Sequence, residues 1–268
     1  MPKTLWITGA SGGLVKATAE AFHRAGWTVI AGARSFTDTA EDRFHRLHLD
    51  VTDEASCRRF AEAAQGISPR VDVLICGAAI LVLGSCELTS AEEYRRVLDA
   101  NFLGTVRMVS LALPLMRQQG DGRILLFSSI NGLLGIPFQS AYTASKHALE
   151  GYAECLSMET APFGVQVCLI EPGDHRGGSD HTRLHAAAED DASPYRQAFS
   201  GATATIHRDE TGGLAPERLA RKVLRHATRR RMRLRLRIAK PDQHLAVWLH
   251  KLLPARLNSL ILRRYYGC

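Results

Sequence analysis

Apolar residues along the first two-thirds of the chain follow two patterns in turn. Short continuous apolar runs, such as 71–75, are typical of strands buried on both faces of a sheet. Longer segments repeat apolar residues every three or four positions, which is typical of helices packed on one face. The runs predict strands at 3–8, 27–33, 47–49, 71–75, 123–127 and 165–170, and the longer segments predict helices at 14–25, 54–65, 91–118 and 141–161.

The alternation of strand and helix predicts the fold class. Strands that lie parallel in a sheet need long crossover connections, and helices supply them. Crossovers of one hand place those helices on both faces. We therefore expect an α/β fold, with residues 1–268 forming a single Rossmann-type domain. Its centre would be a doubly wound parallel sheet of about seven strands.

The regular alternation lapses at 174–213, a segment rich in Asp, His, Ser and Gly. Its length is typical of a functional lid or a disordered loop. A helix is predicted at 216–228, and strict alternation at 231–238 predicts an edge strand with four arginines on one face. Residues 216–268 are interpreted as a basic C-terminal extension of the same domain, ending in an amphipathic tail at 244–266.

Charge is distributed unevenly along the chain. The formal net charge is +7, yet residues 216–268 alone hold 15 basic and 2 acidic residues. Such a tail could attract nucleic acid or a membrane surface. No nucleic-acid motif accompanies it, so we predict solvated faces and no nucleic-acid partner. The apolar side of the tail is expected to pack on the core or line a substrate mouth, with peripheral membrane contact less favoured; it comprises Leu245, Ala246, Val247, Trp248, Leu249, Leu252, Leu253, Leu257, Leu260 and Ile261.

Composition and cysteine spacing indicate a cytoplasmic globular protein. Hydrophobic residues make up 46% of the chain, which excludes a disordered protein. The six cysteines include no close pair, so free thiols in a reducing compartment are expected. The N-terminus has no apolar segment of the secretory type, and the longest apolar stretch, 73–86, is shorter than a bilayer span.

A glycine-rich turn follows the first predicted strand. Backbone N–H groups at such a turn, at the start of a helix, can approach a pyrophosphate. A plain strand–helix turn is the alternative, and an ATPase-type loop is disfavoured because no Lys-Ser or Lys-Thr pair follows the glycines. The candidate cofactor-binding residues here are Gly9, Ser11, Gly12, Gly13 and Leu14.

The end of the second predicted strand indicates which dinucleotide binds. An acidic residue at this point holds the ribose 2′-hydroxyl of NAD, whereas an arginine accommodates the 2′-phosphate of NADP. The strand at 27–33 is followed by Arg34 and contains no acid. Its planar guanidinium can pair with a phosphate. We therefore predict NADP(H) as the cofactor.

A tyrosine and a lysine stand four residues apart in the predicted helix at 141–161. Tyr142 and Lys146 would share one face of that helix. A nearby cation favours the phenolate and so lowers the tyrosine pKa, which would make Tyr142 a usable acid or base. Ser129 follows a predicted parallel strand, at the end of the sheet where ligands bind, and its hydroxyl could donate to a carbonyl oxygen.

Taken together, these motifs resemble the short-chain dehydrogenase/reductase family over nearly the whole chain. The resemblance implies that Tyr142 is the general acid in reduction and the base in oxidation, and that Ser129 holds the substrate oxygen. Lys146 would hold the nicotinamide ribose and lower the Tyr142 pKa, and Asn101 would anchor a water in a proton relay. The same resemblance assigns further cofactor contacts to Asp50, Val51, Cys76, Gly77, Ala78, Pro172 and Gly173.

Two positions depart from the family pattern. Val15 replaces the third glycine of the loop, and the motif usually written Asn-Asn-Ala-Gly reads Cys76-Gly77-Ala78-Ala79. Extra carbons at residue 15 crowd the place where helix, strand and dinucleotide meet. We expect weakened cofactor binding. The alternative is a redox-silent relative that uses the fold for isomerisation, cyclisation or partner binding.

The active-site sequence most resembles the hydroxysteroid and retinol dehydrogenase branch. That resemblance implies a bulky lipophilic ketone or secondary alcohol, of steroid, retinoid or polyketide type, and a homodimer or homotetramer formed through the helices at 91–118 and 141–161. His175, His181 and His185 invite a metal interpretation. No nearby cysteine or motif supports it, so no metal site is predicted.

Overall fold

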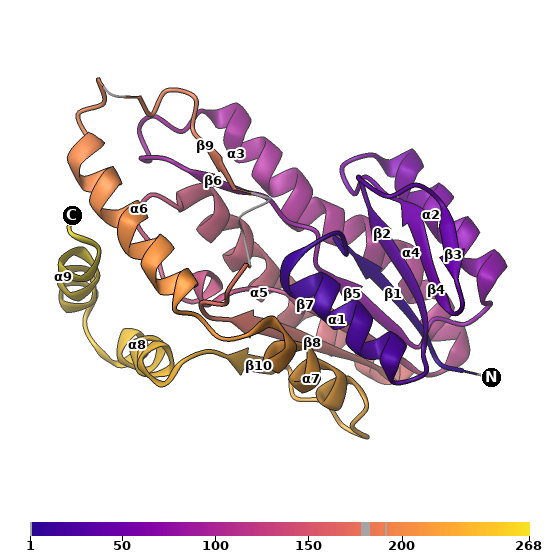
Figure 1. Ribbon diagram of the computed structural model, residues 1–268. Coiled ribbons are helices and arrows are strands. Elements are labelled where there is room, and N and C mark those ends of the chain that lie inside the picture. The colour runs from indigo at the N-terminus through magenta and orange to yellow at the C-terminus, as the bar shows by residue number, and fades with distance from the viewer. Residues whose placement is uncertain (1, 178–182, 191) are drawn as a thin grey trace.

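The computed structural model describes residues 2–177, 183–190 and 192–268, and a twisted sheet runs through its centre (Figure 1). The strands lie in the order β10-β8-β7-β5-β1-β2-β4-β3. Every neighbouring pair is parallel except β3 with β4. Their bounds are β1 Thr4–Thr8, β2 Thr28–Ala33, β3 Thr39–Glu41, β4 Phe44–His48, β5 Val73–Cys76, β7 Gly122–Phe127, β8 Val165–Pro172 and β10 Arg235–Ile238.

Helices cover both faces of this sheet, as the alternation of strand and helix predicts. The helices are α1 Gly13–Arg24, α2 Glu54–Ile67, α3 Ala91–Leu98, α4 Gly104–Gln119, α5 Ser140–Thr160, α6 Arg196–Thr211, α7 Pro216–Ala227, α8 Pro241–Leu252 and α9 Ala255–Tyr266. The doubly wound α/β fold is confirmed.

Side chains of each central strand point alternately to two separate cores. Leu5 and Ile7 of β1 face one core together with Phe22 of α1 and Leu219 of α7. Trp6, between them, faces the other core with Phe60 of α2. This alternation explains why the central strands have no polar face, since both sides are covered.

Three regions of the chain differ from the sequence expectation. The antiparallel edge strand β3, whose three residues are exposed, was not predicted. The segment 174–213, expected to be irregular, contains β9 (Arg183–His185) and α6; β9 pairs with β6 (Leu81–Leu83) in a second, two-stranded sheet. The helix predicted at 91–118 is continuous but is widened by a π-helical turn at Asp99–Leu103.

The C-terminal segment agrees with the prediction in its elements. Strand β10 lies at the edge of the sheet beside β8, and the amphipathic tail forms α8 and α9 on either side of Pro254. In Figure 1 these two helices lie beside α6, at the end of the molecule away from α2 and β3. Among the described residues, none of the helices combines the length and apolar character needed to cross a bilayer.

Candidate active site

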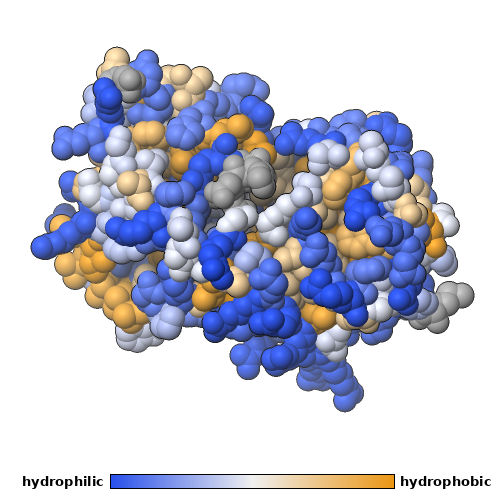
Figure 2. All heavy atoms as spheres, viewed as in Figure 1, coloured by the Kyte–Doolittle hydropathy of each residue, from blue (hydrophilic) through white to orange (hydrophobic). Residues whose placement is uncertain are grey.

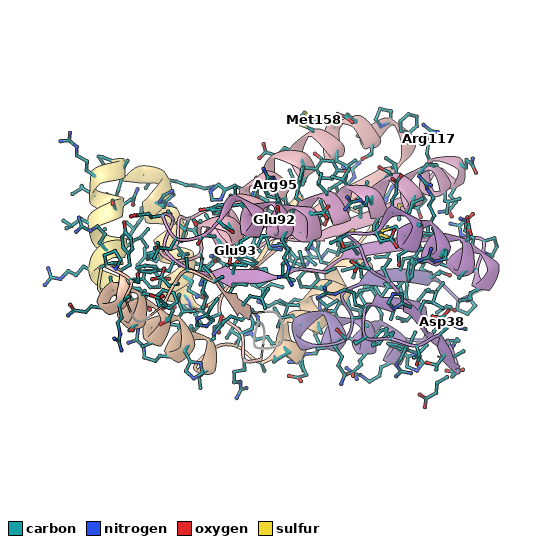
Figure 3. The ribbon with its side chains drawn as sticks, turned by 90° about the horizontal axis from the view of Figure 1, so that it is seen from above. Asp38, Glu92, Glu93, Arg95, Arg117 and Met158 are labelled. Atoms are coloured by element: carbon teal, nitrogen blue, oxygen red, sulfur yellow. The ribbon has the colours of Figure 1, made fainter. Side chains whose placement is uncertain are left out.

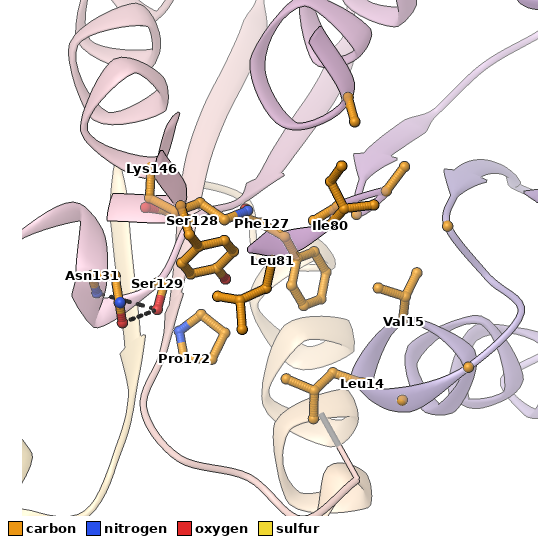
Figure 4. Close-up of a pocket in the computed structure, with 18 of the residues that line it drawn as sticks. Leu14, Val15, Ile80, Leu81, Phe127, Ser128, Ser129, Asn131, Lys146 and Pro172 are labelled. Atoms are coloured by element: carbon orange, nitrogen blue, oxygen red, sulfur yellow. Dashed lines mark hydrogen bonds between the residues drawn. The ribbon is translucent and has the colours of Figure 1, made fainter. Parts of the chain in front are cut away.

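A cavity of about 1180 Å³ opens at the carboxyl ends of the parallel strands. This is the edge of a doubly wound sheet at which ligands bind. Figure 4 shows the glycine-loop side of the cavity, with Leu14 and Val15, opposite the side that holds Ser129 and Lys146. The cavity wall includes all but two of the site residues predicted from the sequence: Gly9, Ser11, Gly12, Gly13, Leu14, Arg34, Asp50, Val51, Gly77, Ala78, Ser129, Tyr142, Lys146, Pro172 and Gly173.

The glycine turn leaves the start of α1 open towards this cavity. Gly9 has a φ of +79°, and a Cβ there would lie 2.6 Å from the backbone of Ala78. The helix has neither a capping side-chain hydrogen bond at Gly12 nor an acidic residue in its first turn. Its unpaired N–H groups and positive dipole end are therefore available to an anion.

Arg34 and Asp50 lie where β2 and β4 end, at the rim of the cavity. Arg34 is exposed. Burial raises the pKa of the Asp50 carboxyl, but hydrogen bonds from the backbone N–H and hydroxyl of Thr52 and the charge of Arg34 outweigh it and hold the pKa below its usual value. A cation thus stands beside an ionised carboxylate at this rim.

The two departures from the family pattern lie against each other. A Cβ placed on Gly77 would lie 2.6 Å from Cγ2 and 3.0 Å from Cγ1 of Val15. Because Gly77 has no side chain, the space beside it is free and Val15 occupies it. Thr8 of β1 ties the strands together here, because its Oγ1 accepts hydrogen bonds from the N–H groups of Gly77 at 3.2 Å and Ala78 at 3.3 Å.

Tyr142 and Lys146 lie one turn apart on α5, as their spacing predicts. The Lys146 ammonium donates a hydrogen bond of 2.7 Å to the Phe127 carbonyl oxygen at the end of β7, and it lies 5.2 Å from the centre of the Tyr142 ring. Burial lowers the pKa of Lys146 to about 7, and the charge of Glu150 opposes this shift.

The expectation that Lys146 lowers the tyrosine pKa is wrong for this structure. Burial raises the pKa of Tyr142 to about 12, opposed by a hydrogen bond with Ser129 and reinforced by the charge of Glu210. Loss of hydration is the largest cause of this shift, and the Lys146 ammonium is directed to the Phe127 carbonyl. The phenol is protonated at neutral pH, as it would be with the usual tyrosine pKa.

Ser129 is oriented by the short turn that follows β7. Its Oγ accepts from the Asn131 backbone N–H and donates to Asn131 Oδ1, each at 3.2 Å, and Figure 4 draws this pair. The Asn131 amide in turn donates to Gln139 Oε1 at 2.7 Å. This chain of hydrogen bonds holds the serine hydroxyl beside the tyrosine.

Two predicted site residues lie behind the cavity wall. Asn101 is in the π-helical turn, where its amide exchanges two hydrogen bonds with the Ile80 backbone, at 2.8 and 2.9 Å, and donates to Ser145 Oγ at 3.0 Å. It joins the turn to α5, and its role in a proton relay stays a prediction. Cys76 is 3% exposed at the end of β5, where burial raises its thiol pKa.

Several cavity or neighbouring residues were not identified from the sequence. Ser128 donates a hydrogen bond to the buried Glu150, which stands one turn beyond Lys146 on α5. The i, i+4 spacing of Lys146 and Glu150 was the available signal. On the substrate side, three carboxylates line the cavity: Asp174, Asp209 and Glu210. Nothing local indicated that they meet, because Asp174 follows β8 whereas Asp209 and Glu210 are neighbours in α6.

The histidines considered as metal ligands make other contacts. His175 is buried and its Nδ1 bonds to the Gly173 carbonyl at 2.9 Å, while the His185 ring packs edge-on against Phe199. His181 lies outside the described residues. Within the described part of the chain, no group of three His, Cys, Asp or Glu side chains is arranged to hold a metal ion.

Comparison with known sequences shows the family of this chain. Residues 3–187 match the family of short chain dehydrogenases. The chain is 33% identical to 3-ketodihydrosphingosine reductase of Bacteroides thetaiotaomicron, across 99% of this chain and 98% of that protein. It is 45% identical to human 17-beta-hydroxysteroid dehydrogenase type 1 over 128 residues, which are 47% of this chain and 38% of that protein.

Comparison with solved structures agrees with the fold. A short-chain dehydrogenase from Streptomyces avermitilis superimposes with a TM-score of 0.82 at 29% identity, covering 100% of this chain and 98% of that one. A second member, from Burkholderia phymatum, superimposes with a TM-score of 0.78 at 24% identity and covers 92% of each chain. The overall fold is thus shared with these proteins.

Proposed function

Because this chain belongs to the short-chain dehydrogenase/reductase family, we propose that it is an NADP(H)-dependent ketoreductase acting on a long, lipophilic ketone. Family membership makes it an oxidoreductase with a nicotinamide dinucleotide. The observation that carries the proposal is the triad of Ser129, Tyr142 and Lys146 on the wall of one large cavity, facing an open helix N-terminus.

Residues around the cavity fit the dinucleotide. The space kept free at Gly9 and the unpaired N–H groups of α1 suit its pyrophosphate. The exposed Arg34 at the rim suits a 2′-phosphate, and Asp50 and Val51 border the adenine side. These features support NADP(H) over NAD(H). The pocket formed by Gly77 for Val15 supports tolerance of the bulkier residue in the loop.

The protein's own groups supply orientation and a proton. The bound dinucleotide contributes the hydride. Ser129 turns its hydroxyl proton from Asn131 Oδ1 to the substrate oxygen, and Tyr142, protonated at neutral pH, transfers its proton to that oxygen as charge develops. Lys146, fixed by the Phe127 carbonyl, lies close enough to the ring to stabilise the tyrosinate that remains.

The substrate side of the cavity combines apolar and acidic side chains. Leu81, Ile136 and Ile206 line it together with Asp174 and other carboxylates. Burial and the charges of Asp209 and Glu210 together raise the pKa of Asp174 to about 6, and the charge of Lys240 opposes this shift. Glu210 pairs with Arg183 and Asp209 with Arg208, whereas Asp174 accepts a hydrogen bond from the neutral Gln243 amide, so Asp174 is the carboxylate that a substrate cation would meet. This supports a lipophilic ketone with an amine, the chemistry of the 3-ketodihydrosphingosine named for the Bacteroides relative.

A steroid ketone is the second candidate. It is supported by the 45% identity to human 17-beta-hydroxysteroid dehydrogenase type 1, although the match covers 47% of this chain. Steroid ketones carry no cation, so the acidic groups of the cavity favour the amine-bearing substrate.

The proposal is tested by following NADPH oxidation with three ketones. We expect turnover of 3-ketodihydrosphingosine, and a KM higher by about tenfold for its N-acylated form, which lacks the ammonium. Tyr142→Phe should lower kcat by about 10²- to 10⁴-fold because it removes the proton donor, while NADPH binding is unchanged. Estrone is the steroid comparison.

Three outcomes contradict parts of the proposal. Equal turnover of the free and N-acylated ketones would remove the role of the carboxylates. Preference for estrone would support the second candidate. A folded protein that binds neither NADPH nor NADH would support the redox-silent alternative.

A further inference from the structure

Exposed apolar side chains are concentrated on the two C-terminal helices. Of the 11 large hydrophobic side chains exposed among the described residues, 7 lie on α8 and α9. From the sequence, the apolar residues of this tail were expected to pack on the core or line the cavity mouth. This expectation is wrong for most of them, because they are exposed. The exposed set is Leu245, Trp248, Leu252, Leu257, Leu260, Ile261 and Tyr265.

Each helix packs on the protein with one face and presents the other outward. Val247 of α8 is 1% exposed and packs with Ile206 and Tyr266, while Leu245, Trp248 and Leu252 lie on the outer side. The corner between the helices is fixed by Asn258, whose amide donates to the carbonyl oxygens of His250 at 3.0 Å and Leu253 at 2.9 Å. We call this outward side of α8 and α9 the apolar end face; Figure 2 shows hydrophobic residues at that end of the molecule.

Basic residues of α8 and α9 flank the apolar end face. Asp209 of α6 also contacts it, because it accepts a hydrogen bond of 2.7 Å from Tyr265, and it pairs with Arg208. After Asp242 the sequence contains no Asp or Glu, and its four charged residues are Lys251, Arg256, Arg263 and Arg264. All four are exposed. An apolar helix side with leucines and a tryptophan, bordered by lysine and arginine, is the pattern of helices that lie in a lipid interface. Its charge is complementary to anionic headgroups.

The apolar end face also adjoins the cavity. Tyr266 on α9 and Ile206 on α6 both line the cavity and pack together in one apolar cluster. A surface bound to α8 and α9 would therefore lie beside the entrance on the substrate side.

We propose that α8 and α9 dock the protein on an anionic lipid surface. The apolar end face enters the boundary between headgroups and acyl chains, and the flanking basic residues contact the headgroups. Docking places the cavity entrance against the layer in which a lipophilic substrate is dissolved. Docking on lipid requires no particular substrate, and vesicle binding is measured without enzyme turnover.

The test is binding of the full chain to unilamellar vesicles, measured by flotation. One set contains phosphatidylcholine alone and the other phosphatidylcholine mixed with phosphatidylglycerol. We expect binding to the mixed vesicles, weakened by salt. Trp248 is a direct reporter: it is 57% exposed, whereas Trp6 and Trp27 are 0% and 7% exposed, so insertion should shift the emission to shorter wavelength.

Leu252→Glu and Leu260→Glu should each weaken binding to the mixed vesicles by about tenfold or more, since each removes a leucine from the lipid phase and adds a like charge. The matched control is Ile67→Glu, which makes the same kind of change on α2 at the opposite end of the molecule. NADPH binding and circular dichroism verify that each variant is folded.

Three results would overturn the inference. The first is a folded protein that ignores mixed vesicles even at low salt. The second is vesicle binding that Leu252→Glu and Leu260→Glu both retain, with no shift in Trp248 emission. Such binding would be electrostatic adsorption through the basic residues, without insertion of the apolar end face. The third is a self-association that Leu260→Glu abolishes, without vesicle binding, because a second copy of the chain would then cover the apolar end face.

Discussion

At the scale of single residues, Val15 and Gly77 act as one unit. Each alone departs from the family pattern at the dinucleotide site, and the valine would crowd any side chain at position 77. Together they fill one volume, which explains how the loop keeps its shape without its third glycine. The steric fit makes their effects interdependent.

Gly77→Ala should lower the free energy of unfolding by about 1–3 kcal/mol, because its Cβ overlaps Val15. Val15→Ala in the same protein should restore most of the loss. Denaturant titration of the four proteins of this double-mutant cycle gives the coupling energy. Gly66→Ala, in α2 with nothing within 4 Å, is the control and should stabilise slightly. Additive effects at positions 15 and 77 would contradict the pairing.

Arg34 provides the second prediction at this scale. Arg34→Ala should raise the Kd for NADPH by about 10- to 100-fold, since a charge-assisted bond to the 2′-phosphate is lost. The Kd for NADH should stay within about twofold. Fluorescence titration with both dinucleotides measures the two constants. Equal weakening of both would mean that Arg34 does not read the 2′-phosphate.

At the scale of elements, α5 carries Tyr142, the proposed proton donor, and the charged residues that follow it along the helix. Lys146, Glu150 and Glu154 follow one another at intervals of one turn. Glu150 is buried and bonded to Ser128 and Arg235, while Glu154 is exposed and bonded to Arg235 alone. Helical periodicity thus places the buried Glu150 carboxylate one turn after Lys146 on the same face of α5.

This arrangement predicts the pH dependence of reduction. Burial lowers the pKa of Lys146 to about 7 and Glu150 opposes that shift. The ammonium exists below this pKa, so kcat/KM for reduction should fall as pH rises through about 7. Glu150→Gln removes the opposing charge and should move this fall to lower pH, by about one unit.

Glu154→Gln is the matched control for that experiment. It removes a carboxylate that also pairs with Arg235 but whose side chain is 55% exposed, so the pH profile should not move. An unshifted profile in Glu150→Gln would mean that Glu150 carries no charge that Lys146 senses.

A hydrogen bond at the start of α3 joins this helix to the segment that follows β9. Glu93 of α3 completes a capping box with Ser90 and also accepts a hydrogen bond of 2.9 Å from the Ala187 N–H, after β9. Figure 3 shows Glu92, Glu93 and Arg95 together on α3. The helix cap therefore also anchors the segment that was expected to be irregular.

At the scale of the whole molecule, ion pairs join the edge strand β10 to the rest of the sheet. Arg235 bonds to Glu150 of α5 and, at 3.0 Å, to the fully buried Glu171 of β8; Arg237 bonds to Glu171 at 2.9 Å. The arginines of this strand were expected to be solvated. For Arg235 and Arg237 the expectation is wrong, because both form ion pairs with buried carboxylates. They neutralise carboxylates that would otherwise be buried as unpaired charges.

Arg235→Met should therefore lower the free energy of unfolding by about 1–3 kcal/mol, less than the loss of a whole buried pair, because Arg237 still neutralises Glu171. Arg231→Met removes an exposed arginine just before the strand and should change stability by less than about 0.5 kcal/mol. Urea denaturation compares the two. Equal stability of both variants would contradict a structural role for Arg235.

The sequence by itself determined the features that depend on neighbours along the chain. Alternation of apolar runs and helical segments determined the doubly wound sheet, because each element must bury its apolar side. The spacing of Tyr142 and Lys146 determined that they share a helix face, and the glycine turn determined an open helix start. These patterns have a local physical cause, so they could be predicted.

Only the tertiary structure decided which distant groups meet. The fit of Val15 against Gly77, the pairing of Arg235 with Glu150 and Glu171, and the burial that raises the pKa of Tyr142 all depend on packing between separate elements. The same holds for the apolar end face, since an amphipathic pattern is identical whether the helix packs on a core or faces outward. Solvent exclusion, which no local pattern encodes, decided each of these cases.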